Sequence, residues 1–208
     1  MQPIDALLIF FLASLLLALT PGPGNLFVLA QAAQQGKLAG LAVTIGLCTG
    51  LLVHTAAVAL GVAAIFQASA VAFSLLKFIG AVYLLYLAYG AFISGAESGW
   101  NQHPSRLNFS KLYARGVIMN VTNPKVSLFF LAFLPQFTDP TIGPLLPQIF
   151  ILGFLFFLST ILIFGGISLL AGGVGGYYRK SAKAQIILNR IAGTVFVALA
   201  IKLALAKR

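Results

Sequence analysis

The sequence predicts an all-α polytopic membrane protein with about six transmembrane helices. Hydrophobic residues make up 60% of the 208-residue chain, charged residues make up 8%, and the mean hydropathy is +1.02. A soluble domain carries about 25% charged residues. Apolar runs of bilayer-spanning length, for which about 20 residues are needed, recur between short polar gaps. We therefore expect a single transmembrane domain over residues 1–208.

The net charge of +10 comes from 13 Lys and Arg against 3 Asp and Glu. In a soluble protein this excess would suggest nucleic-acid binding, but here the basic residues lie in gaps between apolar runs. The positive-inside rule explains that placement. With the N-terminus outside, the outer side receives only Lys207 and Arg208, and the inner loops receive Lys37, Arg106, Lys111, Arg115, Arg179, Lys180 and Lys183. We predict an outer, periplasmic N-terminus and no nucleic-acid partner.

Two features of the N-terminal part narrow the class further. Cys48 is the only cysteine and lies within an apolar run, which excludes an intramolecular disulfide and a cysteine zinc site. No Lys or Arg precedes Lys37, so the basic start of a signal peptide is missing. We expect the first apolar run to be kept as a transmembrane helix.

The apolar runs predict the helices in order, because each run ends at polar, proline or glycine residues. A polar turn at 34–37, a polar segment at 94–111 and a proline-rich loop at 135–147 separate them. The predicted helices cover about 5–33, 38–66, 71–93, 112–134, 148–174 and 185–206.

Helix-breaking residues interrupt the first and fourth of these helices. Residues 20–25 hold two prolines and two glycines, and Asn123-Pro124 follows Thr122 in the fourth helix. Proline removes a backbone donor and clashes with the preceding turn, and glycine weakens the helix. Hydrocarbon cannot satisfy the freed backbone groups, so they must face protein or a watery cavity. In transporters, such breaks bind substrates and ions.

The two halves of the chain, about 1–100 and 108–208, share one plan. Each has three helices and opens with a proline-broken one, and an odd number of helices makes the halves inverted repeats. At 1.5 Å per residue, each break lies roughly 12–15 Å from the inner end of its helix, near mid-membrane. We predict that the breaks share one cavity. The alternative is two unrelated kinks, since no residue-level repeat extends beyond the broken helices.

Five motifs follow one another along nearly the whole chain: Pro21-Gly22-Pro23-Gly24-Asn25, Gly36-Lys37-x-x-Gly40, Gly46-x-x-x-Gly50-x-x-x-His54, Asn120-x-x-Asn123-Pro124-Lys125 and Phe129-Phe130-Leu131-Ala132-Phe133-Leu134-Pro135-Gln136-Phe137. Together they resemble the lysine exporter / RhtB (homoserine and threonine efflux) family of amino-acid exporters. The resemblance implies a secondary transporter of the bacterial inner membrane that exports amino acids or close derivatives. Many members of that family carry an acidic residue just after Pro-Gly-Pro, where this chain has Gly24.

An amino-acid zwitterion needs N–H donors or a cation for its carboxylate, and oxygen acceptors or an aromatic face for its ammonium. The helix that restarts near Asn25 offers free N–H groups and a positive dipole end. Lys125 offers a cation, whose insertion cost of about 3 kcal/mol must be compensated. The predicted substrate-binding residues are Thr20, Pro21, Gly22, Pro23, Gly24, Asn25, Asn120, Thr122, Asn123, Pro124 and Lys125.

A structural interpretation of the same residues stays open. Asn25 and Asn123 are also typical caps of broken helix ends. Lys125 can extend along the cavity to the inner surface. The sequence does not choose between these roles and substrate binding.

His54 is the candidate for proton coupling, because no Asp or Glu lies centrally in the apolar runs. It follows Gly46 and Gly50 at a spacing of four residues, on a face typical of close helix packing. Imidazole titrates near physiological pH. The alternative is a neutral histidine hydrogen-bonded to a backbone carbonyl.

Three further features have two interpretations each. Tyr83, Tyr86 and Tyr89 form a stripe that faces a pore or packs at an interface. Lys77 reaches the outer surface or belongs to the site. Glycine-rich faces, including the pairs at 165–166, 172–173 and 175–176, serve a homodimer contact or packing within one chain.

From these residues and the resemblance we expect a secondary exporter of amino acids, small neutral ones or their derivatives, working by proton antiport or down the substrate gradient. No Walker motif is present, and we expect no cofactor. The alternative is efflux of another small solute or of a cation by the same topology. A cation exporter would require a cluster of ligands, and among His, Asp, Glu and Cys only His54 and Cys48 lie within the bundle. An enzyme would need a serine or aspartate pair or an HExxH helix, which are missing. A scaffold protein without transport activity is a fourth option.

Overall fold

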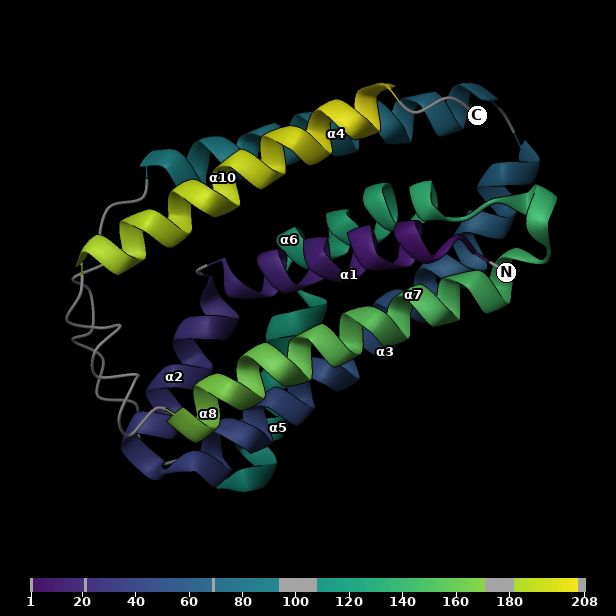
Figure 1. Ribbon diagram of the computed structural model, residues 1–208. Coiled ribbons are helices and arrows are strands. Elements are labelled where there is room, and N and C mark those ends of the chain that lie inside the picture. Colours follow the sequence, from purple (N-terminus) through teal and green to yellow (C-terminus); the bar gives the residue numbers. More distant parts are fainter. Residues whose placement is uncertain (1, 21, 69, 94–107, 171–181, 206–208) are drawn as a thin grey trace.

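The computed structural model describes residues 2–20, 22–68, 70–93, 108–170 and 182–205, and within these ranges the chain is helical without any strand (Figure 1). The first half holds α1 (Ile4–Leu19), α2 (Pro23–Gln35), α3 (Lys37–Ala68) and α4 (Ala70–Ile93). The second half holds α5 (Phe109–Val121), α6 (Pro124–Leu128), η1 (Phe129–Phe133), η2 (Leu134–Phe137), η3 (Pro140–Ile142), α7 (Leu145–Thr160), η4 (Ile161–Gly165), α8 (Gly166–Leu170) and α10 (Ala182–Leu205).

Both predicted helix breaks are present. α1 and α2 meet at a bend of 61°, and α5 and the helix that begins at Pro124 meet at 48°. Lys37–Gly61 and Leu145–Leu170 are long and apolar enough to cross a bilayer, and in the described ranges the count rises from two to four if each bent pair is one span. Shorter apolar stretches lie in α4 and α10. The chain is therefore an all-helical membrane protein.

Local capping explains where the helix boundaries differ from the prediction. α5 begins at Phe109, three residues early, because the Asn108 side chain accepts a hydrogen bond from the Lys111 backbone N–H at 2.9 Å. Gly36, with φ of +90°, forms the expected polar turn after α2. The predicted polar segment is described only from Asn108, and the pairs 172–173 and 175–176 lie outside the described residues.

Side chains organise the loop before α7. The predicted fourth helix, expected to end near residue 134, continues as helical structure to Phe137. The Gln148 amide then accepts a hydrogen bond from the Asp139 N–H at 2.9 Å and donates to the carbonyls of Asp139 and Gly143 at 2.9 and 3.1 Å. A buried glutamine thus closes the proline-rich loop and lets α7 begin at Leu145.

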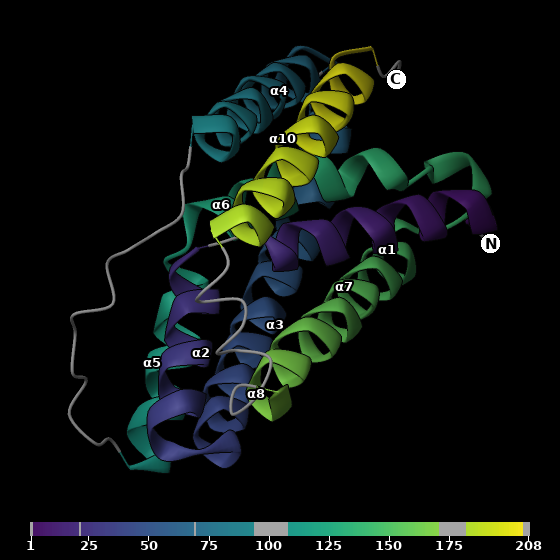
Figure 2. The same ribbon diagram turned by 60° about the vertical axis from the view of Figure 1, so that its left-hand side comes forward.

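The helices form a body and a flanking pair. α4 and α10 pack against each other along one side of the molecule (Figures 1 and 2). In the body, α1 packs on α7, whereas α5 packs on α3. The first segment of each half therefore contacts the second helix of the other half.

Aromatic side chains join the first helix to the end of the fourth. The Phe10 ring of α1 lies 5.8 Å from that of Phe129 and 5.3 Å from that of Phe137, between ring centroids. Phe129 also lies 5.4 Å from Phe156 of α7. These rings fill the core beside the second break.

The glycine face of α3 packs within the chain, as the sequence predicts for a close helix contact. A Cβ atom on Gly46 would overlap the Tyr113 carbonyl, and one on Gly116 would overlap the Val43 carbonyl. A Cβ on Gly50 would lie 2.6 Å from that of Asn120. The backbones of α3 and α5 approach closely because these side chains are absent.

Candidate functional site

The first break leaves the start of α2 without a side-chain cap. Gly22 precedes α2 in an extended conformation and has no side chain to offer, and Pro23 is the first helical residue, where its missing N–H costs nothing. The first N–H groups of any helix lack partners within the helix. This end of α2 therefore presents free donors and a positive dipole end. Pro21 lies outside the described residues.

The other side of the first break is the C-terminal end of α1. Buried Thr20 ends this helix, and its hydroxyl donates to the Leu16 carbonyl at 2.8 Å. The Asn25 side-chain amide donates to the Ala18 carbonyl at 2.6 Å. Asn25 therefore satisfies one of the carbonyls that α1 leaves free.

The second break is capped by its own residues. The Asn123 side chain accepts a hydrogen bond from the Lys125 N–H at 3.0 Å, and Pro124 is the first residue of α6. The hydroxyl of exposed Thr122 donates to the Ile118 carbonyl at 2.8 Å. The Ser127 hydroxyl donates to the Asn123 carbonyl at 3.0 Å. This break matches the structural interpretation of its asparagine as a helix cap.

Lys125 connects the two breaks. Its Nζ atom donates to the Thr20 carbonyl at 3.0 Å and to the Leu17 carbonyl at 3.1 Å. A Cβ on Gly22 would lie 3.3 Å from this Nζ atom. A cation at the C-terminal end of a helix is stabilised by the helix dipole and by the free carbonyls. The ammonium is thus held inside the helix bundle by α1.

His54 of α3 touches the second break from the other side. Its side chain is 8% exposed, and Nε2 lies 3.1 Å from the Asn120 carbonyl oxygen. That carbonyl also accepts a hydrogen bond from the Asn123 N–H at 3.0 Å. The His54 ring packs 5.6 Å from the Phe130 ring. A histidine bonded to a backbone carbonyl is the arrangement that the sequence left open as the alternative to a coupling role.

The remaining predicted residues lie close to this network. Asn120 is buried against Gly50, and its Oδ1 atom has no hydrogen-bond partner in the described part of the chain. Gly24 is buried at the start of α2, where an added Cβ would be 3.5 Å from Leu47. Exposed Pro23 and Pro124 shape the backbone. The structure therefore brings the described members of the predicted site into one connected region.

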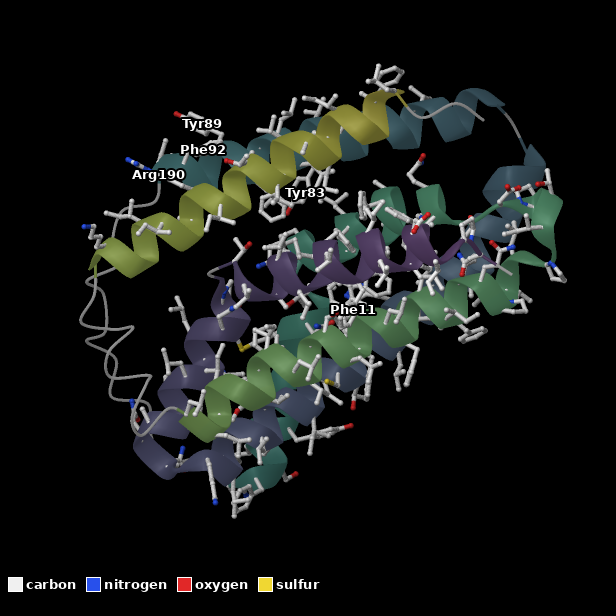
Figure 3. The ribbon with its side chains drawn as sticks, viewed as in Figure 1. Phe11, Tyr83, Tyr89, Phe92 and Arg190 are labelled. Atoms are coloured by element: carbon white, nitrogen blue, oxygen red, sulfur yellow. The ribbon has the colours of Figure 1, made fainter. Side chains whose placement is uncertain are left out.

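Other candidate groups lie elsewhere. Tyr86 and Tyr89 are 66% and 64% exposed, and Figure 3 shows Tyr89 on the outer side of the α4–α10 pair and Tyr83 on the side of α1. The exposed tyrosines of this stripe, Tyr86 and Tyr89, therefore lie on the surface and not at the breaks. The Lys77 side chain is outside the described part. Among the residues that are described, no group of three or more His, Cys, Asp or Glu could hold a metal ion.

Sequence reasoning missed the acceptors on α1 and the π-helical turns. The carbonyls of Leu17 and Ala18 carry no signal in the sequence, because every residue has one. The turns η1 and η4 widen the fourth and fifth helices at Phe129 and Ile161, and π-turns often occur at functional sites. Buried Thr160 directly precedes η4, and its hydroxyl has no partner among the described residues.

Comparisons with known proteins cover almost the full chain. The model of the LysE type translocator family matches residues 15–207. An uncharacterized membrane protein of Vibrio cholerae serotype O1 is 32% identical over 96% of this chain and 97% of its own length. The homoserine/homoserine lactone efflux protein of Salmonella typhi is 30% identical over 95% of both chains. The leucine efflux protein of Salmonella choleraesuis is 28% identical over 94% of this chain and 92% of its own. No solved structure matches.

Proposed function

This chain belongs to the LysE type translocator family, and we propose that it exports amino acids across the bacterial inner membrane as a secondary transporter. The observation that carries the proposal is the meeting of the two helix breaks through Lys125, with the start of α2 left free for an anion. Broken helices at the centre of the membrane are where secondary transporters hold their substrates. The relatives named as homoserine and leucine efflux proteins supply the substrate class.

We propose small neutral amino acids or their derivatives as substrates. The free N–H groups of α2 suit a carboxylate. The two acidic residues in the described ranges, Asp5 and Asp139, are exposed and lie at the start of α1 and in the loop before α7. The side chain of a lysine or arginine substrate would bring a second positive charge next to Lys125 without a carboxylate to balance it. Such substrates are therefore disfavoured.

Inverted repeats within one transport domain are the proposed architecture. The halves are about 1–100 and 108–208. Two relations support them: each half opens with a broken helix, and α1 packs on α7 as α5 packs on α3. In such transporters the halves rock against each other around a site that both contribute to. Here the C-terminal end of α1 and the N-terminal end of α2 would contact the substrate, and α6 would supply Lys125.

Proton coupling through His54 is a further part of the proposal. A carbonyl oxygen only accepts hydrogen bonds, so Nε2 of His54 carries a proton toward Asn120 and leaves Nδ1 as the basic atom. A proton taken up at Nδ1 would place a charge beside the second break without losing that bond. Export down the substrate gradient alone is the alternative.

Two proposals concern the setting in the membrane. The positive-inside distribution supports an outer, periplasmic N-terminus, which reporter fusions at both ends would test.

For a homodimer, the glycine face of α3 is already occupied by α5. A dimer contact would therefore use another surface, such as the outward face of α4 around Tyr86 and Tyr89, and crosslinking in membranes would test it.

Export from proteoliposomes loaded with a mixed pool of amino acids tests the function. We expect selective release of a few neutral amino acids, faster with a pH gradient than without one. Release of arginine in preference to neutral amino acids would refute the substrate class, and release of none would refute amino-acid export. His54→Ala should remove the acceleration by the gradient and keep export down the substrate gradient. Equal acceleration in wild type and variant would exclude His54 as the coupling group.

A further inference from the structure

An ammonium group is already bound at the C-terminal end of α1. The Nζ atom of Lys125 lies within hydrogen-bond distance of two main-chain carbonyls, those of Leu17 and Thr20. The next free carbonyl, of Ala18, is taken by the Asn25 amide. The end of α1 thus provides a pair of acceptors that a primary ammonium fits.

We propose that these two carbonyls are the binding site for the ammonium group of the exported amino acid, and that Lys125 occupies the site until the substrate displaces it. This inference rests on the proposed function, because it names the part of the same site that takes the substrate's positive charge. In the absence of substrate, the Lys125 ammonium then makes the hydrogen bonds that the substrate ammonium would make.

The chemistry of the two ammonium groups is the same. Both the lysine side chain and an α-amino group carry three N–H donors and no acceptor at neutral pH. The negative end of the α1 dipole attracts either one equally. Since two ammonium ions cannot share two carbonyls, the substrate and Lys125 exclude each other.

The geometry of the break suits an α-amino acid, whose two charged groups are attached to the same carbon atom. The bound Nζ atom lies next to the start of α2, because a Cβ on Gly22 would be 3.3 Å from it. Gly22 directly precedes the uncapped end of α2. An ammonium at the end of α1 therefore has the proposed carboxylate site beside it.

Displacement of Lys125 would also release α6 from α1. In the described structure, the hydrogen bonds of Lys125 to Leu17 and Thr20 join the first break directly to the second. A substrate that replaces the lysine keeps the carbonyls of α1 satisfied and leaves α6 free to move. The substrate binds only when Lys125 has left the α1 carbonyls. Substrate binding would therefore favour the arrangement of the two halves in which α6 is no longer bonded to α1.

Binding of fragments to Lys125→Met tests the proposal. The purified full-length protein is titrated with 3-methylbutylamine, which has only the ammonium, and with 4-methylpentanoate, which has only the carboxylate. If Lys125 fills the site for more than about 90% of the time, its removal should tighten amine binding roughly tenfold or more. Binding of 4-methylpentanoate should not tighten. The control variant Lys111→Met changes an exposed lysine of α5 and should bind both compounds like the wild type.

Equal amine affinity in wild type and Lys125→Met would overturn the proposal. If that variant does not fold, Lys125→Gln keeps N–H donors for the carbonyls but lacks the charge, and it should tighten amine binding by a smaller factor. No tightening in Lys125→Gln would count against the proposal equally. Leucine export by the wild type, measured in parallel, separates the two proposals. Export without the amine effect refutes the ammonium site alone, and the amine effect without export of any amino acid refutes the exporter function alone.

Discussion

The two helix breaks of this transporter look alike in the sequence and differ in how their ends are satisfied. The second break is capped within itself, by Asn123 on the N–H of Lys125 and by Thr122 and Ser127 on nearby carbonyls. At the first break, Gly22 leaves the start of α2 uncapped, and the end of α1 depends on Lys125 from the other half of the chain. Under the proposed function, the substrate binds at the first break, and the second break keeps α6 and Lys125 in place.

The two breaks also pack differently against α3. At the second break, an added Cβ on Gly50 would lie 2.6 Å from the Asn120 Cβ. At the first break, an added Cβ on Gly24 would meet the Leu47 side chain at 3.5 Å, an ordinary contact. The second break is therefore packed tightly against α3, whereas the first has room for an added Cβ atom at Gly24.

Lys125→Met should clearly lower the stability, because it removes the hydrogen bonds that connect the two breaks. Hydrogen bonds to a charged group contribute roughly 1.5–3 kcal/mol, and the carbonyls of Leu17 and Thr20 would lose their donor. We expect the free energy of unfolding to fall by about 2 kcal/mol, measured by denaturation in detergent micelles. Lys111→Met is the control and should stay within about 0.5 kcal/mol of the wild type. A fully stable Lys125→Met would show that the breaks do not depend on each other.

Substitution of Gly50 and of Gly24 by alanine should show that the second break packs more tightly against α3 than the first. Gly50→Ala should cost about 1–3 kcal/mol of unfolding free energy, because α5 must move away from α3. Gly24→Ala makes only an ordinary contact and should not lower it, because alanine favours the helix over glycine by about 0.5–1 kcal/mol. The same denaturation experiment compares both variants. Equal destabilisation by the two would contradict the contrast in packing.

Asn123→Ala should remove the cap of α6 at the second break. Loss of an N-cap side chain costs about 1 kcal/mol. We expect that loss of stability with little change in the affinity for neutral amino acids, because Asn123 caps α6 and the proposed substrate site is at the first break. Calorimetric titration with leucine, beside thermal unfolding, measures both. A large loss of affinity at wild-type stability would assign Asn123 to the binding site.

Gly22→Ser should make the first break resemble the second with little change in stability, because only the flexible end of Lys125, 3.3 Å from the new Cβ, must shift. Serine and glycine differ by only a few tenths of a kcal/mol as caps, but the serine hydroxyl would occupy the free N–H groups of α2. We expect the affinity for 4-methylpentanoate to fall about threefold as the hydroxyl competes for these donors. Unchanged affinity would show that the carboxylate does not bind at α2.

Much of the fold follows from the sequence. Hydropathy locates the helices, because a bilayer-spanning helix needs about 20 apolar residues and charges cannot stay in hydrocarbon. Prolines and glycines locate both breaks, because they act on the helix in which they stand. The motifs around Pro21 and Asn123 identify the family, which the comparison over residues 15–207 confirms. The earlier start of α5 was missed, since a side-chain cap at Asn108 extends the helix beyond its apolar run.

What the sequence by itself determined was therefore local: an all-helical membrane protein, the places where two helices break, and a set of polar residues at those places. Only the tertiary structure decided how the set is connected. Lys125 binds carbonyls 105 and 108 residues away, and His54 reaches the carbonyl of Asn120 across 66 residues. Main-chain carbonyls are the same in every residue, so no pattern of side chains reveals which of them a packed helix will bring to a lysine or a histidine.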